Sequence, residues 1–190
     1  VTEKGTITAE HVVNAAGCFA PEVSAMIGVT LPIVNLEHQY LVTENHSSLA
    51  ESASELPVLR DSSCSAYLRQ EAQGLLVGPY ETYGSKPWAL SGMDWNFDRE
   101  LFPGDLERLM PFLDRCMEIL PIFSEVGIKT VINGPITHTP DDNVLAGPQA
   151  GHKNFWNLCG SSIGIAQGGL GKYMAQWMVH GQTELNMASL

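Results

Sequence analysis

A strand, a glycine-rich turn and a helix follow one another at residues 155–172, and this run constrains the fold more than any other. It reads FWNLCGSSIGIAQGGLGK, and the helix is expected over residues 164–180. Glycines after a strand let a ligand approach the backbone closely, and the free N–H groups that begin a helix favour an anion or an electron-rich carbonyl. The P-loop spacing fails because Tyr173 follows Lys172, and no clean GxGxxG is present. The run therefore predicts either a ligand-facing turn or tight packing of a helix on a sheet.

The rest of the chain alternates between helical and extended patterns, which predicts a fold that combines α/β and α+β parts. We expect a parallel strand near each end and an antiparallel middle that includes a hairpin. Asp105 should cap the clearest helix, which Pro121 ends. The expected strands lie within residues 6–17, 31–43, 57–60, 66–69, 75–80, 131–137 and 154–158, the expected helices span 20–27, 104–120 and 164–180, and residues 83–99 read as a long loop.

Composition excludes several classes of protein. The chain has 190 residues, of which 44% are hydrophobic, so it can form a core. Its net charge of −11 and the lack of a basic run argue against a nucleic-acid partner, and no apolar stretch is long enough to span a membrane. Four cysteines without a CxxC pair fit a reducing compartment. No Met or targeting segment opens the chain, so we expect it to be part of a longer protein.

Two side chains are candidates for proton chemistry. His38 lies between apolar residues on one face of its expected strand, which is typical of either a satisfied core histidine or a catalytic one. Tyr67 lies on the next hairpin, where its ring could pack and its hydroxyl could form a hydrogen bond. If their strands are neighbours, the two residues form a proton-handling pair. The other histidines lack the spacing of metal ligands, so no metal site is predicted; they are His11, His46, His138, His152 and His180.

Other polar residues favour structural roles. Cys18 and Cys159 flank glycine turns, and small buried hydrophobes are the simplest interpretation of both. Asp141 and Asp142 follow a Thr-Pro pair and are typical turn formers. The chain has neither a GxSxG elbow nor an HExxH helix, which leaves serine hydrolases and zincins without support.

Six segments together resemble one enzyme family. They are HVVNAAGCFAPEVSAMIG, LEHQYLVTE, ELPVLRD, AYLRQEAQGLLVGPYE, INGPITHTPDDNVLAGP and GIAQGGLGKYMAQWMVHG. In this order they resemble the dimethylglycine dehydrogenase and sarcosine dehydrogenase family of D-amino-acid-oxidase-like flavoproteins. The resemblance extends from about residue 5 to residue 187, and AYLRQE, GPYE and NGPIT favour the dimethylglycine branch.

The resemblance implies oxidation of N-methylated glycines, with hydride passing from the N-methyl carbon to FAD. The resulting imine hydrolyses or gives its one-carbon unit to tetrahydrofolate, and an electron-transferring flavoprotein removes the electrons. The implied location is the mitochondrial matrix or the bacterial cytoplasm. His38 and Tyr67 match the family's substrate-positioning and proton-handling pair. The residues that match its flavin-binding segments are Ala16, Gly17, Phe19, Ser161, Ser162, Ile163, Gly164, Ile165 and Ala166.

The chain also departs from the family's pattern. The amino-terminal GxGxxG turn, the upstream histidine that can link FAD covalently, and the folate-binding half are absent, so this chain alone is expected to be inactive. Ser161-Ser162 and Asp141-Asp142 replace residues usual in relatives, and Gly134 stands where monomeric sarcosine oxidases have a flavin-linking cysteine. Two alternatives stay open: a non-catalytic module with the flavoprotein fold, and an enzyme acting on sarcosine or another secondary or tertiary amine.

The same resemblance predicts how the chain is divided. Residues 1–29 and 150–190 should belong to an FAD-binding, Rossmann-like part. Residues 30–149 should form a mostly antiparallel substrate-binding sheet that presents His38 and Tyr67 to the flavin.

Overall fold

The chain forms two compact units, each built from separate stretches of sequence. The computed structural model describes residues 1–51, 54–82, 84–98, 100–160 and 164–187, with only the backbone of residues 164–167. The first unit comprises Val1–Asn35, Ala89–Trp95 and Ile136–Leu190, and the second comprises Leu36–Trp88 and Asn96–Pro135. We describe the two units separately.

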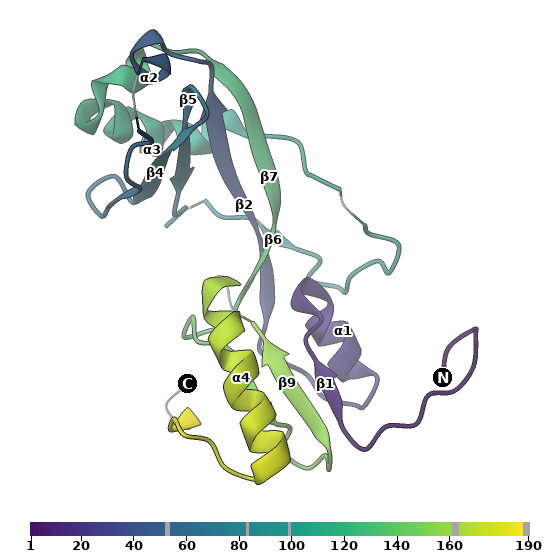
Figure 1. Cartoon of the computed structure of the whole chain (residues 1–190). Helices are drawn as coiled ribbons and strands as arrows, with labels where there is room; N and C mark the ends of the chain where they lie inside the picture. Colours follow the sequence, from purple (N-terminus) through teal and green to yellow (C-terminus); the bar gives the residue numbers. More distant parts are fainter. Residues whose placement is uncertain (52–53, 83, 99, 161–163, 188–190) are drawn as a thin grey trace. The chain divides into compact units, whose positions relative to one another are not determined.

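The first unit is a three-stranded sheet in the order β1-β9-β8, with helices beside it (Figure 1). β1 runs parallel to β9, with Val12 opposite Phe155, and β8 is antiparallel to β9. Helix α4 packs on β9 and β8. The elements are β1 (Val12–Asn14), η1 (Gly17–Phe19), α1 (Ala20–Ala25), β8 (Leu145–Pro148), β9 (Phe155–Cys159) and α4 (Gly164–His180).

The first unit confirms the parallel pairing expected of the two chain ends but corrects the burial of β1. Val12 and Val13 are 50% and 39% exposed, whereas the polar Asn14 is buried. β1 lies at the outer edge of the order β1-β9-β8. β8 was not predicted, because Gly147 and Pro148 give it a weak strand pattern.

The second unit is built on a six-stranded sheet in the order β3-β4-β5-β2-β6, with β7 also paired to β2. The pairs β3–β4, β4–β5 and β5–β2 are antiparallel, and the predicted hairpin is confirmed as β4 and β5. β6 falls inside the segment predicted as a long loop. The strands are β2 (Val34–Thr43), β3 (Leu59–Asp61), β4 (Ala66–Glu71), β5 (Gly74–Pro79), β6 (Pro87–Trp88) and β7 (Ile128–His138), with short helices α2 (Ser47–Ala50) and η2 (Pro121–Ser124).

Helix α3 (Leu106–Ile119) packs on β5 and supplies much of the core of this unit. Its start confirms the expected cap, because Asp105 Oδ1 accepts a hydrogen bond from the Arg108 backbone N–H at 3.2 Å. The buried apolar side chains of the helix pack with those of the sheet; they include Leu109, Leu113, Cys116, Leu41, Leu68 and Val77.

The buried face of β2 differs from the one that its apolar alternation suggests. Gln39, Leu41 and Thr43 are buried, while His38 and Tyr40 on the other face are half-buried. Polar side chains are buried on this face because they form hydrogen bonds with the start of α3. The Gln39 side-chain amide donates to the Asp105 carbonyl oxygen and accepts from the Asp105 backbone N–H. His38 is therefore not a core histidine but lies on the more open face of the sheet.

The cysteines and the turn residues largely follow expectation. All four cysteines are free; Cys159 is buried as predicted, whereas Cys18 is only half-buried. Asp142 adopts a positive φ of 58° in the expected turn, and its carboxylate lies 3.1 Å from His138 Nδ1. Among the helices that the structure describes, none combines the length and hydropathy needed to cross a bilayer. The described residues also bring together no group of three His, Cys, Asp or Glu side chains suited to a metal ion.

Candidate active site and cofactor turn

The sheet register brings His38 and Tyr67 to the same face of the second unit. Tyr67 is opposite Gly78 on β5, and Val42 of β2 is opposite Leu76, so the even-numbered side chains of β2 share the face of Tyr67. The strands of His38 and Tyr67 are not neighbours, however, because β5 lies between β4 and β2. Neighbouring strands are about 4.8 Å apart, so the backbones of β4 and β2 are separated by about twice that distance.

Because Gly78 has no side chain, the Tyr67 ring can lie over β5 and bring its hydroxyl closer to β2. A Cβ atom at Gly78 would lie 1.9 Å from Tyr67 Cζ and 2.3 Å from its hydroxyl oxygen. The far end of the tyrosine ring therefore occupies the space that a side chain on β5 would fill, and the hydroxyl lies over β5 rather than over its own strand. Because β2 is the next strand, the ring extends toward the strand that carries His38 and Tyr40.

The Tyr67 hydroxyl is kept protonated by its surroundings. Burial raises its pKa above the usual value, and the neighbouring hydroxyls of Tyr80 and Tyr40 add to the effect. The rings of Tyr67 and Tyr80 also contact each other, with 5.6 Å between centroids. At neutral pH this hydroxyl is thus a hydrogen-bond donor.

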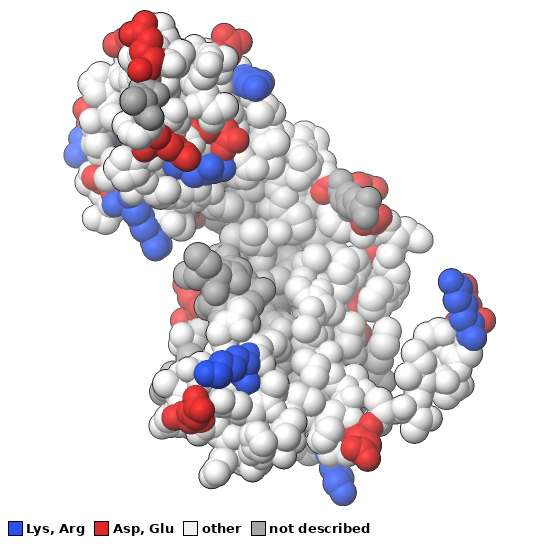
Figure 2. Space-filling view, in the orientation of Figure 1, with Lys and Arg blue, Asp and Glu red and all other residues white. Residues whose placement is uncertain are grey.

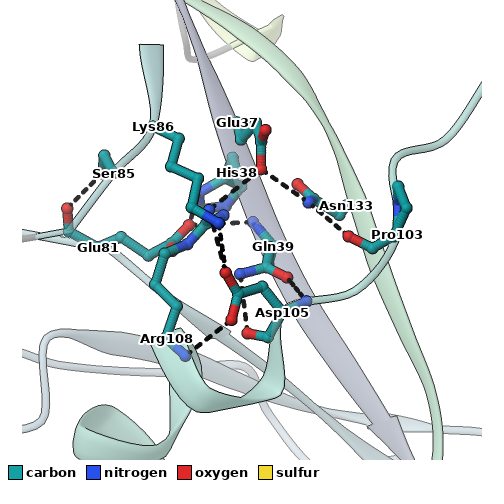
Figure 3. A network of polar contacts seen from close by, with 10 residues as sticks. All are labelled: Glu37, His38, Gln39, Glu81, Ser85, Lys86, Pro103, Asp105, Arg108 and Asn133. Carbon is teal, nitrogen blue, oxygen red and sulfur yellow. Dashed lines mark hydrogen bonds and ion pairs between the residues drawn. The ribbon is translucent and has the colours of Figure 1, made fainter. Parts of the chain in front are cut away.

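His38 is flanked by a buried carboxylate. Its Nδ1 lies 3.9 Å from Glu81 Oε2, and the exposed fractions of the two side chains are 20% and 1% (Figure 3). Glu81 accepts hydrogen bonds from Arg108 Nε at 2.5 Å and from the Gln39 backbone N–H at 3.2 Å. These bonds fix the Glu81 carboxylate beside the imidazole.

Arg108 ties Glu81 into a larger network on the helix-covered face of the sheet (Figure 3). Its Nη1 donates to Glu37 Oε2 at 3.1 Å, and Asn133 donates to the same oxygen at 3.0 Å. Burial opposes ionisation of Glu37, but these hydrogen bonds outweigh it and lower the pKa of the carboxyl. Burial likewise opposes the charge on Arg108, but its bonds to Glu37 and Glu81 raise its pKa.

A second pair of charges lies at the start of α3. Lys86 Nζ is 2.5 Å from Asp105 Oδ2, and together with the Arg108 backbone N–H it holds the pKa of the Asp105 carboxyl below its usual range. The charged side chains Glu37, Glu81, Lys86, Asp105 and Arg108 thus carry three negative and two positive charges, and His38 lies beside this excess of one negative charge.

The first unit contains the turn that the sequence assigns to the cofactor. β1 ends at Asn14 and β9 ends at Cys159, so the carboxyl ends of two parallel strands meet beside the turn. Gly17 has a φ of +58°, and no atom lies within 4 Å of the position of a Cβ there. A cavity of about 110 Å³ lies beside it and is lined by Ala15, Gly17, Thr137, Leu158, Cys159 and Gly160.

This geometry fits the flavin of FAD, because ligands of open α/β sheets bind at the carboxyl ends of parallel strands. Asn14 holds the turn in place: its amide donates to Ala20 O and Ser24 Oγ, both at 2.9 Å, and its side-chain oxygen accepts from Ala16 N. Phe19 follows the turn and stacks on Trp95, with 5.4 Å between ring centroids and 12° between planes.

The remaining cofactor residues predicted from the sequence belong to the start of α4. Ser161, Ser162 and Ile163 lie outside the described residues. Gly164, Ile165 and Ala166 form the first turn of the helix, and only their backbone is described. A role for these six residues in flavin binding stays a prediction.

Most of the polar site lies in the motifs that carried the resemblance, although several residues were not singled out. Gly78 and Glu81 are the ends of GPYE, and Glu37 precedes His38 in LEHQY. Arg108 lies outside every quoted segment, on α3. An arginine in the first turn of an amphipathic helix reads as a solvated side chain, so only the tertiary structure identifies it as the partner of Glu81.

Known proteins match the chain over its whole length. The sequence profile of the family described as FAD dependent oxidoreductase matches residues 1–177. Mitochondrial dimethylglycine dehydrogenase of Homo sapiens is 41% identical over 100% of this chain and 22% of its own length. Mitochondrial sarcosine dehydrogenase of Mus musculus is 35% identical over 99% of this chain and 20% of its own length. The mitochondrial pyruvate dehydrogenase phosphatase regulatory subunit of Mus musculus is 29% identical over 100% and 22%.

A solved structure supports the fold independently. The L-proline dehydrogenase of P. horikoshii superposes with a TM-score of 0.75 at 23% identity, over 97% of this chain and 46% of that one. The chain therefore spans about a fifth of the length of its curated dehydrogenase relatives and somewhat under half of this structural neighbour. Since the profile covers most of the chain and the fold agrees, the chain belongs to the family of FAD-dependent oxidoreductases that includes dimethylglycine and sarcosine dehydrogenases.

Proposed function

We propose that the protein containing this chain oxidises an N-methylated glycine, with dimethylglycine as the preferred substrate. The observation that carries the proposal is the common face of His38 and Tyr67, across which Gly78 lets the tyrosine hydroxyl extend. The higher identity to dimethylglycine dehydrogenase, 41% against 35% for sarcosine dehydrogenase, supports the choice of substrate.

His38 acts in this proposal as the acceptor of the substrate's ammonium proton. Only a neutral amine can share its lone pair with the N-methyl carbon as hydride leaves that carbon. The carboxylate of Glu81, 3.9 Å from His38 Nδ1, stabilises the imidazolium formed by this transfer. Tyr67 orients the substrate by donating a hydrogen bond from a hydroxyl that remains protonated at neutral pH.

Residues of the first unit hold the cofactor in this proposal. The turn at Ala16 and Gly17, the ring of Phe19 and the segment 161–166 face the flavin. Residues 1–29 and 150–190 belong to the FAD-binding part. Bound FAD supplies the acceptor for the hydride, that is, one proton and two electrons. The positive end of the α4 dipole favours negative charge on the bound ligand. The substrate-binding part corresponds to residues 30–149.

The protein in this proposal also has two partners and a cellular location. An electron-transferring flavoprotein reoxidises the cofactor, and regions of the protein outside this chain pass the one-carbon unit to tetrahydrofolate. The printed names of the dehydrogenase relatives are mitochondrial, which supports the mitochondrial matrix, with the bacterial cytoplasm as the counterpart.

Flavin reduction in the full-length protein tests the assignment of roles. We expect His38→Ala to slow reduction by dimethylglycine about 100-fold or more in stopped-flow absorbance, the usual range for a lost acid–base group. Tyr67→Phe should also slow it, through loss of one hydrogen bond. Both variants should keep wild-type flavin content and unfolding midpoints. Wild-type reduction rates in both variants would show that these residues do not have the proposed roles.

A non-catalytic role is the second candidate, and the relative named as a regulatory subunit favours it. A protein of that kind would lack flavin absorbance after purification, whereas the enzyme should have it. A third possibility keeps the enzyme and changes its substrate to sarcosine or another secondary or tertiary amine. Rates on a panel of such amines distinguish it from the first, because pocket shape sets the preference.

A further inference from the structure

One buried carboxylate of the second unit lies beside both an arginine and the proposed base of the reaction (Figure 3). Glu81 Oε1 accepts a hydrogen bond from Arg108 Nε at 2.5 Å, and Glu81 Oε2 lies 3.9 Å from His38 Nδ1. Oε2 also accepts a hydrogen bond at 3.2 Å from the backbone N–H of Gln39, the residue that follows His38. The arginine and the histidine's own strand therefore set the orientation of the carboxylate together.

The backbone of Glu81 is held in place as well. Ser85 Oγ donates to the Glu81 carbonyl oxygen at 2.6 Å, within the segment that follows β5. The side chains of Glu81 and Arg108 are both buried, so neither can easily exchange its partner for water. Without the arginine, the carboxylate would lose its charged partner in a buried position, which favours its movement toward another group. Arg108 therefore fixes where this carboxylate lies.

Exposed charges contribute little at His38. The basic side chains visible in Figure 2 are dispersed among acidic ones, and solvent screens such charges over about 8–10 Å. The Glu81 carboxylate is buried, so water screens its charge from the imidazole less than it would at the surface. The location of this one carboxylate therefore matters more for the histidine than the net charge of the chain does.

The location of the carboxylate also selects the nitrogen of His38 that can act as a base. A carboxylate beside an imidazole favours a proton on the ring nitrogen that faces it, and the other nitrogen then has the lone pair. Glu81 faces Nδ1, which assigns the lone pair to Nε2. The separation of 3.9 Å is longer than a hydrogen bond, and catalytic hydrogen bonds commonly shorten when the substrate binds.

We propose that Arg108 is a positioning residue, which holds the Glu81 carboxylate beside His38 Nδ1 so that Nε2 accepts the proton of the substrate's ammonium group. The proposal rests on the proposed function and deepens it, since it names the nitrogen that acts as the base and the residues that orient it. The proton passes from the substrate nitrogen to Nε2, and the positive charge of the resulting imidazolium lies beside the carboxylate. Arg108 acts through Glu81, and Glu81 acts through His38.

Flavin reduction by dimethylglycine, followed by stopped-flow absorbance in the FAD-loaded full-length protein, tests this assignment. Glu81→Gln should lower the limiting rate about 10- to 100-fold, the range for removing a carboxylate that orients a metal-binding histidine, with little change in the substrate concentration at half-maximal rate. Arg108→Gln should lower the limiting rate about 10-fold, since misplacing a reacting group by about 1 Å can cost up to about 100-fold. Arg108→Lys should retain part of the rate, because an ammonium group can still pair with Glu81.

The double variant Glu81→Gln/Arg108→Gln separates positioning from an independent role of the arginine. If Arg108 acts through Glu81, the double variant should be no slower than Glu81→Gln, whereas independent roles would multiply the two losses. The double variant removes both buried charges together, so it allows the comparison even if Arg108→Gln does not fold. Arg115→Gln is the matched control, because Arg115 is half-exposed on the same helix and paired with Glu118, and it should reduce its flavin as wild type does.

Crystal structures of the full-length protein give a result that does not depend on turnover. Glu81 Oε2 should lie farther from His38 Nδ1 in Arg108→Gln than in wild type, and Arg108→Lys serves for this comparison if Arg108→Gln does not fold. A carboxylate that keeps its place without the arginine, or a double variant slower than Glu81→Gln, overturns the positioning role even if the wild-type enzyme oxidises dimethylglycine. A wild-type protein that does not oxidise dimethylglycine contradicts the proposed function instead, and a displaced carboxylate in the arginine variant then still supports the control of Glu81 by Arg108.

Discussion

The two faces of the six-stranded sheet each carry an arginine, and their surroundings are opposite. The side chain of Arg108 is 7% exposed and binds Glu81 and Glu37 within the network that α3 covers. Arg60 is exposed and stacks on Tyr80, with no carboxylate partner among the described residues. A guanidinium already bound by carboxylates supports the fold, whereas one held in place but unpaired is available to a ligand.

Removing each arginine in turn tests this contrast most directly. We expect Arg108→Met to lower the free energy of unfolding by about 3–5 kcal/mol, because Glu81, 1% exposed, loses its charged partner. Arg60→Met is the matched control and should change it by less than about 0.5 kcal/mol, as for an exposed side chain. Urea unfolding followed by tryptophan fluorescence measures both. Equal losses of stability in the two variants would contradict the contrast.

The close packing of Tyr67 on Gly78 belongs to the open face and should give an intermediate effect. In Gly78→Ala the new Cβ would overlap the tyrosine ring, so the ring must move away from β5. We expect a loss of about 1–3 kcal/mol from overpacking and slower flavin reduction by dimethylglycine.

Gly169→Ala is the matched control for this substitution. Gly169 is exposed on α4, and no atom lies within 4 Å of a Cβ built there. This variant should gain about 0.5–1 kcal/mol from helix propensity. Unchanged stability and flavin reduction in Gly78→Ala would show that the Tyr67 ring has other positions of equal energy.

The smallest expected effect is the pH dependence of stability that comes from Glu37 in the network of Arg108. The folded-state pKa of Glu37 is lowered from 4.5, so its contribution to stability is complete above pH 4.5 and is lost as pH falls through the folded-state value. Between about pH 6 and about pH 3, wild type should therefore lose more stability than Glu37→Gln, by less than about 1 kcal/mol, as for other partly solvated ion pairs. Parallel pH profiles for the two proteins would exclude this contribution. Urea unfolding at a series of pH values makes the comparison.

The sequence predicted local structure better than it predicted the partners of polar side chains. The bounds of α4, the Asp105 cap and the β4–β5 hairpin follow from glycine placement, a capping side chain and alternation, which all act over a few residues. His38 and Tyr67 could be named by resemblance. Their common face could not be derived, because it depends on β5 lying between their strands.

The same limit applies to the two faces of β2. Alternation places Leu36, His38 and Tyr40 on one face but does not show which face is covered, and the buried side chains include Gln39 and Thr43. Polar residues can be buried when hydrogen-bond partners come from distant elements, such as Asp105 for Gln39, 66 residues away. Single-sequence patterns contain no information about such partners, and for the same reason Arg108 could not be connected to Glu81.

The first unit is assembled from stretches of the chain that the ribosome synthesises at different times. Asn14 and Asn157, which lie opposite each other on β1 and β9, are 143 residues apart in sequence. At a synthesis rate of about 5–20 residues per second, β1 leaves the ribosome about 7–30 s before its partner strand. The β4–β5 hairpin pairs residues that are much closer in sequence, so the second unit can fold first during translation. Until β9 is made, Val12 and Val13 belong to an unpaired nascent strand, the stage at which binding by a chaperone would be most useful.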